Sequence, residues 1–212
     1  ELREATNYQV PIFLKMGATR PRYDVAIAAK AGVDVVVVDG AEGGTGASPE
    51  LLLDHTGIPL ISAIRAAREA LDDCGKTDEV SLVAAGGIRS GTDVAKCLAL
   101  GADAVMIGTA GLVALGCNSP RYFDDYAALG TAPGRCHHCH TGLCPVGVAT
   151  QDPELEKRVD IPAASERVAR FLTAMTMEVS LLAKACGKSN VHNLEVEDLR
   201  AMSLEASAFT GV

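Results

Sequence analysis

Aromatic residues and positive charge are both scarce in this sequence. Only 4% of its 212 residues are aromatic, none is Trp, and 19 Lys and Arg stand against 27 Asp and Glu, for a formal net charge of −8. An acidic surface repels phosphate backbones, which argues against a nucleic-acid partner. No apolar run approaches the roughly 20 residues that cross a bilayer, and the first residues lack the pattern of a secretory signal. We therefore expect a cytoplasmic protein without a membrane partner.

Short apolar runs recur at residues 10–16, 33–38, 80–85 and 104–107. Such runs are typical of strands buried on both faces of a parallel sheet. Helix-like segments with apolar residues three and four apart lie between them and end at Gly. The pattern predicts four β/α units.

Specialised glycine-rich segments follow three of these runs, at residues 39–46, 86–91 and 108–109. Repeated β/α units form either an open doubly wound sheet or a barrel, and consecutive specialised strand-end loops favour the barrel. A complete barrel takes about 250 residues. We therefore predict an α/β fold in which this chain is the C-terminal half of a (β/α)8 TIM barrel, and so a fragment.

Three regions are expected along the chain. Residues 1–117 would form the β/α units, and residues 118–163 a long Cys-rich loop of the kind that usually carries function. Residues 164–212 would form the final barrel helix, with one apolar stripe, and a helical tail. In that tail we expect a short helix over residues 194–208, with Asn193 as its candidate cap.

Glycines after the last two strands predict a phosphate site. Without a Cβ, Gly86, Gly87 and Gly108 let backbone N–H groups approach an anion, and the helices that follow would aim their positive ends at it. A single Gly-Gly pair more often only turns the chain, but two such loops on neighbouring barrel strands favour phosphate. Arg89 is either an added donor or a solvated side chain.

Two charged residues near strand ends are candidate catalytic groups. Lys15 ends an apolar strand, where an inward ammonium would meet an anionic flavin ring or a substrate carboxylate. The alternative is a lysine that faces the outer helices. Glu42 lies in a glycine-rich loop, where it would hydrogen-bond a ring edge or a substrate amine, or cap a helix that begins near Ser48.

Three of the seven Cys form a cluster: Cys136, Cys139 and Cys144, the last followed by Pro. The C-x2-C and C-x4-C spacings allow the thiolates to converge on an iron–sulfur cluster, and a Pro after the last ligand is typical of such motifs. Zinc fits the spacing equally well, helped by three nearby His residues. The other isolated cysteines, Cys74, Cys97 and Cys186, are expected to be small buried hydrophobes.

Four segments together resemble the FMN-binding synthase domain of the glutamate synthase family. They are residues 43–49 (Gly-Gly-Thr-Gly-Ala-Ser-Pro), 86–94, 108–117 and 139–151, and they occur in the family's order. The tail, residues 185–194, is similar to short single-domain members, including subunits that act in N-methylglutamate formation.

The resemblance implies an FMN oxidoreductase that makes L-glutamate from 2-oxoglutarate and ammonia, with electrons passing through a three-iron, four-sulfur cluster. It implies that Lys15 contacts the flavin or 2-oxoglutarate. The implied cofactor site consists of Gly43, Gly44, Thr45, Gly86, Gly87, Ile88, Arg89, Gly108 and Thr109. The implied cluster ligands are Cys117, Cys139 and Cys144. Implied partners are an amidotransferase and an electron-donating subunit or ferredoxin, in an oligomer.

The sequence departs from the family in two places. The family's His-Asp before Gly-Gly-Thr-Gly is here Ala41-Glu42, and an insertion separates Cys117 from Cys139, while Cys136 lies three residues before Cys139. Either Cys117 or Cys136 is then the first cluster ligand, or both bind and make a four-iron cluster. Alternative functions are an N-methylglutamate synthase-type subunit, an IMP dehydrogenase-like phosphate-binding barrel, suggested by residues 101–108, and a zinc-stapled interaction subunit without activity.

Overall fold

The computed structural model describes residues 1–44 and 48–212. These residues fall into two compact units. The first consists of residues 1–43, 56–107 and 177–212, and the second of residues 44–55 and 108–176. The predicted cofactor residue Thr45 lies outside the described residues.

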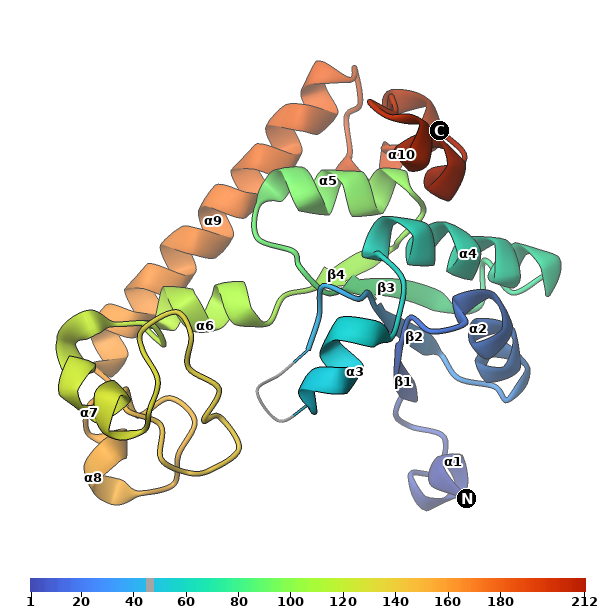
Figure 1. The fold of residues 1–212 in the computed structure, drawn as a ribbon. Coiled ribbons are helices and arrows are strands. Elements are labelled where there is room, and N and C mark those ends of the chain that lie inside the picture. Colours follow the sequence, from blue (N-terminus) through green and yellow to red (C-terminus); the bar gives the residue numbers. More distant parts are fainter. Residues whose placement is uncertain (45–47) are drawn as a thin grey trace. The chain divides into compact units, whose positions relative to one another are not determined.

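The first unit is built on a four-stranded parallel sheet (Figure 1). Its strands lie in chain order: β1 (Phe13–Gly17), β2 (Val35–Asp39), β3 (Ser81–Ala85) and β4 (Ala104–Met106). The parallel α/β fold predicted from the apolar runs is therefore confirmed. Each strand begins close to its predicted place, except β1, which begins three residues later than expected.

Helices cover one face of this sheet. The helices of the first unit are α1 (Leu2–Ala5), α2 (Pro21–Lys30), α4 (Leu60–Asp73), α5 (Gly91–Ala99) and α10 (Leu204–Thr210). Helix α4 packs on α2 and on strands β2 and β3. Its residues Ile64 and Ala67 are fully buried, as are Val36 and Leu82 of the sheet. The helix-like segment expected between β2 and β3 corresponds to α4, whose bounds were not predicted.

The opposite face carries a cluster of strand residues, namely Val35, Val37, Val83 and Ala85. The edge strands continue this face, because Phe13 pairs with Val35 and Met106 pairs with Ala85. Phe13 is 59% exposed and Met106 is 41% exposed. An arc of four parallel strands with helices outside it and apolar side chains on its inner face is what half of an eight-stranded barrel contains.

The C-terminal region corrects one prediction. The long helix α9 (Ile161–Ala185) forms as expected and belongs to the first unit from Met177 onward. The single helix expected over residues 194–208 with Asn193 as its cap is wrong. Two 3-10 turns, η2 (Val191–Asn193) and η3 (Val196–Asp198), come first. Local side-chain bonds explain this difference, because Asn190 caps η2 and Ser203 caps α10 through its Oγ, which accepts a hydrogen bond from Ala206.

The second unit contains short helices and irregular chain. Its elements are α3 (Glu50–His55), α6 (Thr109–Leu115), η1 (Pro120–Tyr122), α7 (Phe123–Ala128), α8 (Pro153–Glu156) and the first part of α9. Arg167 of α9 donates to the carbonyl oxygen of Leu115 at 2.7 Å and so ties α9 to the end of α6. In both units, the helices that the structure describes include none long and apolar enough to span a bilayer.

Candidate functional site

Lys15 and Asp39 form an ion pair at the carboxyl edge of the sheet. Lys15 pairs in register with Val37, so it lies on the same face as the strand cluster and away from the helices. Its Nζ lies 2.8 Å from Oδ2 of Asp39, the last residue of β2, and the ammonium side chain is 52% exposed. The arrangement presents a positive charge on the inner face of the arc, beside a carboxylate that the sequence analysis did not single out.

Glu42 caps a helix. Its Oε2 accepts a hydrogen bond from the N–H of Leu60 at 2.9 Å, at the first residue of α4. The residue before Leu60 is Pro59, whose side chain offers no cap, so Glu42 supplies the acceptor from another loop. The sequence predicts that Glu42 caps a helix near Ser48, but the helix that it caps is α4. A flavin or substrate contact by Glu42 stays a prediction.

Both glycines of the Gly-Gly pair after β3 have a backbone conformation that favours glycine. Gly86 and Gly87 have φ values of +104° and +70°, in the region that favours glycine. A Cβ at Gly87 would lie 2.8 Å from Cβ of Glu42. Among the hydrogen bonds of residues 1–44 and 48–212, none uses the N–H of Gly87 or Ile88.

The start of α5 differs from expectation. Ser90 and Asp93 form a capping box, in which the Asp93 carboxylate also accepts from the N–H of Arg89 at 2.9 Å. The N–H of Gly91 donates to Oε2 of Glu178 at 2.6 Å. Two protein carboxylates therefore neutralise the positive end of α5, which the sequence predicts to face a phosphate. The Arg89 side chain is exposed, and Ile88 is buried and anchors the loop.

The remaining predicted glycines occupy different units. Gly43 lies in the first unit, where a Cβ would come within 2.0 Å of Oδ1 of Asp39. Gly44 lies in the second unit, with φ +138°, and a Cβ there would lie 2.3 Å from Cδ2 of Leu53. Gly108 precedes α6 as its cap residue, and Thr109 is the first residue of that helix; both are exposed. Their contact with a cofactor stays a prediction.

Three of the predicted ligand cysteines pack around one buried tyrosine in the second unit. Tyr126 is fully buried, and its apolar cluster includes Cys117, Cys136 and Cys144. The Tyr126 hydroxyl donates to the carbonyl oxygen of Cys117 at 2.6 Å. Burial, with added repulsion from the thiolates of Cys117, Cys136 and Cys144, raises the pKa of Tyr126 to about 12.

The fourth cysteine, Cys139, is exposed but lies within electrostatic reach of Cys117. The pKa of Cys117 is raised first by burial and then by the neighbouring thiolates of Cys139, Cys144 and Cys136. The structure thus gathers all four predicted ligands in one region of the second unit. Among the described residues, however, no set of three His, Cys, Asp or Glu side chains is arranged to hold a metal ion.

Arg158 supports the segment that follows Cys144. Its guanidinium donates to the carbonyl oxygen of Pro145 at 2.7 Å and to Oδ1 of Asp125 at 3.1 Å. The same group stacks over the Tyr122 ring, 4.7 Å from its centroid. These contacts join α7, the end of α8 and the Cys-rich chain. No local pattern in the sequence points to Arg158, because its partners are far from it in the chain.

The histidines beside the cysteines do not add to a ligand set in this structure. The His138 Nε2 lies 3.1 Å from the carbonyl oxygen of Leu129, and its ring stacks on His137 at 4.7 Å. The His138 Nδ1 is buried and has no hydrogen-bond partner among the described residues.

The isolated cysteines behave differently from one another. Cys97 is buried, and burial, followed by repulsion from Asp93 and Glu42, raises its pKa to about 12, so it stays a thiol. Cys74 is half-buried. Cys186 is exposed, so its prediction as a buried hydrophobe is wrong; it follows the last residue of α9, where the helix ends in solvent.

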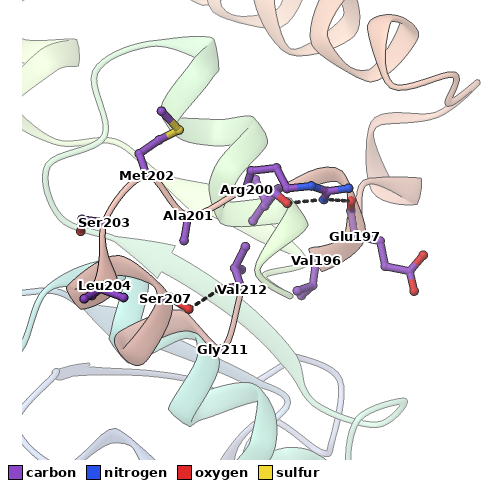
Figure 2. A pocket seen from close by; sticks show the side chains of 11 residues that line it. Val196, Glu197, Arg200, Ala201, Met202, Ser203, Leu204, Ser207, Gly211 and Val212 are labelled. Carbon is purple, nitrogen blue, oxygen red and sulfur yellow. Dashed lines mark hydrogen bonds between the residues drawn. The ribbon is translucent and has the colours of Figure 1, made fainter.

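An open hollow lies in the C-terminal segment of the first unit, and no predicted site residue lines it. Its walls come from residues between Val196 and Val212 (Figure 2). There, Ser207 donates to the carbonyl oxygen of Val212 at 2.7 Å and Arg200 donates to that of Glu197 at 2.7 Å. Its polar groups thus partly satisfy one another.

The fold is similar to that of solved flavocytochrome b2 structures, which are TIM barrels. One, a variant with pyruvate bound, aligns with 97% of this chain and 39% of its own, with a TM-score of 0.59 and 21% identity. The chain therefore has a parallel α/β fold of the barrel type.

Sequence comparison defines the family. The family model described as a conserved region in glutamate synthase matches residues 1–189. A glutamate synthase large subunit-like protein from Rhizobium meliloti (strain 1021) is 52% identical over the whole chain, which covers 48% of that relative. The archaeal glutamate synthase [NADPH] of Methanocaldococcus jannaschii is 43% identical over 91% of the chain and 35% of its own length. The chain belongs to the glutamate synthase family and spans half or less of the length of these relatives.

Proposed function

We propose that this chain forms the C-terminal half of the flavin-binding barrel in a glutamate synthase-type oxidoreductase. The proposed reaction is the reductive amination of 2-oxoglutarate to L-glutamate. The observation that carries the proposal is the position of the Lys15 ammonium, on the inner face of the arc at its carboxyl edge, in a chain of this family. Barrel enzymes build their sites at this edge.

The residues after β3 fit the phosphate of FMN. Gly86 and Gly87 have positive φ values, and no hydrogen bond among the described residues uses the N–H groups of Gly87 and Ile88. We propose that these residues and Arg89 hold FMN, and contact of Gly108 and Thr109 with the cofactor stays a prediction from the sequence. The chemistry that FMN supplies when bound is two-electron transfer as a hydride equivalent.

Lys15 has a defined task in this reaction. Ammonia adds to the keto carbon of 2-oxoglutarate and water leaves, and the resulting carbon–nitrogen double bond takes up two electrons and two protons to give L-glutamate. The substrate carries two carboxylates, so an ammonium at the carboxyl edge binds and orients it. Glu42 fixes the loop after β2 through its bond to α4.

The cysteines of the second unit fit an iron–sulfur cluster by the chemistry of their donor set. We propose Cys117, Cys139 and Cys144 as ligands, with Cys136 as an alternative or a fourth. One-electron transfer is the chemistry that such a cluster supplies when bound. Tyr126 and Arg158 hold the protein around these thiols through their bonds to Cys117 and Pro145.

The proposed partners follow from the reaction. It needs ammonia or another amine, so an amidotransferase is the expected supplier, and it needs an electron-donating subunit or a ferredoxin. Methylamine as the amine would give N-methylglutamate. Family membership favours these functions over an IMP dehydrogenase-like barrel and over a zinc-stapled subunit without activity. We further propose a cytoplasmic oligomer.

A lysine substitution tests the proposed function. In the full-length protein that contains this chain, Lys15→Gln removes the ammonium and is expected to lower kcat/KM for 2-oxoglutarate about 100-fold. The assay measures L-glutamate formed from 2-oxoglutarate and ammonium, with reduced methyl viologen as the electron donor.

The matched control is Lys76→Gln, which removes an ammonium from a pair with Glu79 far along the chain from the site. It is expected to match the wild type. No glutamate formation by the wild type, or equal kinetics for Lys15→Gln and Lys76→Gln, would contradict the proposal.

A further inference from the structure

Asp39 lies where three strands end together. It is the last residue of β2 and pairs in register with Gly17 of β1 and Ala85 of β3. Its Oδ2 is 2.8 Å from Nζ of Lys15, and its side chain is only 21% exposed. The carboxylate is therefore more enclosed than the ammonium that it pairs with.

Two glycines from different loops make room for this carboxylate. A Cβ on Gly43 would lie 2.0 Å from Oδ1 of Asp39, and a Cβ on Gly86 would lie 2.9 Å from the same atom. Contacts under 3.0 Å force a side chain to shift, so any larger residue at either position would displace the carboxylate. The absence of a side chain at both glycines therefore leaves the space that the Asp39 carboxylate occupies.

The backbone of Asp39 is fixed on both sides. Its carbonyl oxygen accepts from the N–H of Ala18 at 2.8 Å, and the next residue, Gly40, donates to the carbonyl oxygen of Ala85 at 2.9 Å. The lysine is the longer and more exposed member of the pair. A half-exposed ion pair adds little to folding stability, so stability alone gives no reason for this arrangement.

We propose that Asp39 is a positioning residue, which holds the Lys15 ammonium at the carboxyl edge of the sheet in the place where it meets the anionic substrate. This inference rests on the proposed function, because Asp39 acts through Lys15. A lysine without a partner has four side-chain bonds free to rotate and spreads its charge over many positions. Asp39 removes that freedom before the substrate arrives, so less of the binding energy is spent on ordering the side chain.

The test is a double-mutant cycle in the flavin-loaded, full-length protein. Asp39→Asn keeps the shape of the side chain and removes its charge. It is expected to lower kcat/KM for 2-oxoglutarate about tenfold, mostly through KM. Because Asp39 acts through Lys15, Asp39→Asn combined with Lys15→Gln is expected to be no worse than Lys15→Gln alone. Asp39→Ser, which is smaller and still polar, serves as the second variant if the Asn variant does not fold.

The control is Asp73→Asn, which removes a carboxylate from an exposed pair with Arg22 at 2.6 Å and is expected to leave KM unchanged. Losses that add in the double variant, or an unchanged KM in Asp39→Asn, overturn the positioning role while leaving the proposed function intact. If Lys15→Gln alone changes nothing, the proposed role of Lys15 fails, and this inference fails with it.

Discussion

Cys139→Ser in the full-length protein is expected to remove most of the bound iron and sulfide while FMN remains. A serine oxygen is a poor ligand for a site that selects thiolates. Cys139 is exposed, so its substitution leaves the apolar packing around Tyr126 intact. The flavin and the cluster use different residues of the chain, so the flavin content should be unaffected. Metal analysis, acid-labile sulfide and flavin release measure the three quantities on one sample.

Cys186→Ser is the matched control, because Cys186 is also exposed and lies outside the proposed ligand set. It is expected to keep full iron content. The same substitution at Cys117 and at Cys136 separates the alternatives for the first ligand. If both variants lose iron, the cluster has four protein ligands. If only one variant loses iron, its cysteine is the third ligand beside Cys139 and Cys144. Unchanged iron content in Cys139→Ser would refute this ligand assignment.

The second large effect is expected from Gly86→Ala. Gly86 has φ +104°, and an alanine there costs about 1–2 kcal/mol in backbone strain. Its Cβ would also lie 2.9 Å from Oδ1 of Asp39 and 3.0 Å from the backbone nitrogen of Gly40, and forcing this contact costs about another 1–3 kcal/mol. The variant should unfold more easily and bind FMN at least about tenfold more weakly, because the loop that approaches the phosphate shifts.

Gly32→Ala separates strain from crowding. Gly32 has φ +86° but no atom within 4 Å of an added Cβ, so only the backbone strain applies. Urea unfolding of both variants gives the difference in the free energy of unfolding. An equal loss in the two variants, with normal FMN affinity in Gly86→Ala, would show that the loop after β3 tolerates a side chain and would count against its role in binding.

The sheet was predictable because its strands are short apolar runs, of which the central strands β2 and β3 are largely buried. A strand such as β2, with four successive valines, has no polar face and is recognised from composition alone. Helix α4 was predicted only as a segment between two strands, because its N-terminal cap comes from Glu42 in another loop and not from a neighbouring residue. The prediction of one helix over residues 194–208 failed for a local reason. The side chains of Asn190 and Ser203 cap shorter elements and so interrupt a pattern that looks helical.

The candidate site was predictable where residue type alone limits what the chain can do. Glycines that require a positive φ and cysteines at ligand spacing are recognisable in the sequence. Asp39, Tyr126 and Arg158 were missed because their roles depend on which distant segments meet them. One local feature pointed to Asp39, namely an acidic residue placed directly after a fully apolar strand. Tyr126 gave no comparable indication, since burial of a tyrosine in a polar segment depends on the path of the chain.

The flavin content of the purified full-length protein tests the central claim most directly. The protein is denatured in the dark, and the released chromophore is identified by chromatography and quantified against protein. The account predicts a yellow-brown protein that releases FMN in an amount equal to its chains. A colourless protein that releases no flavin would contradict it.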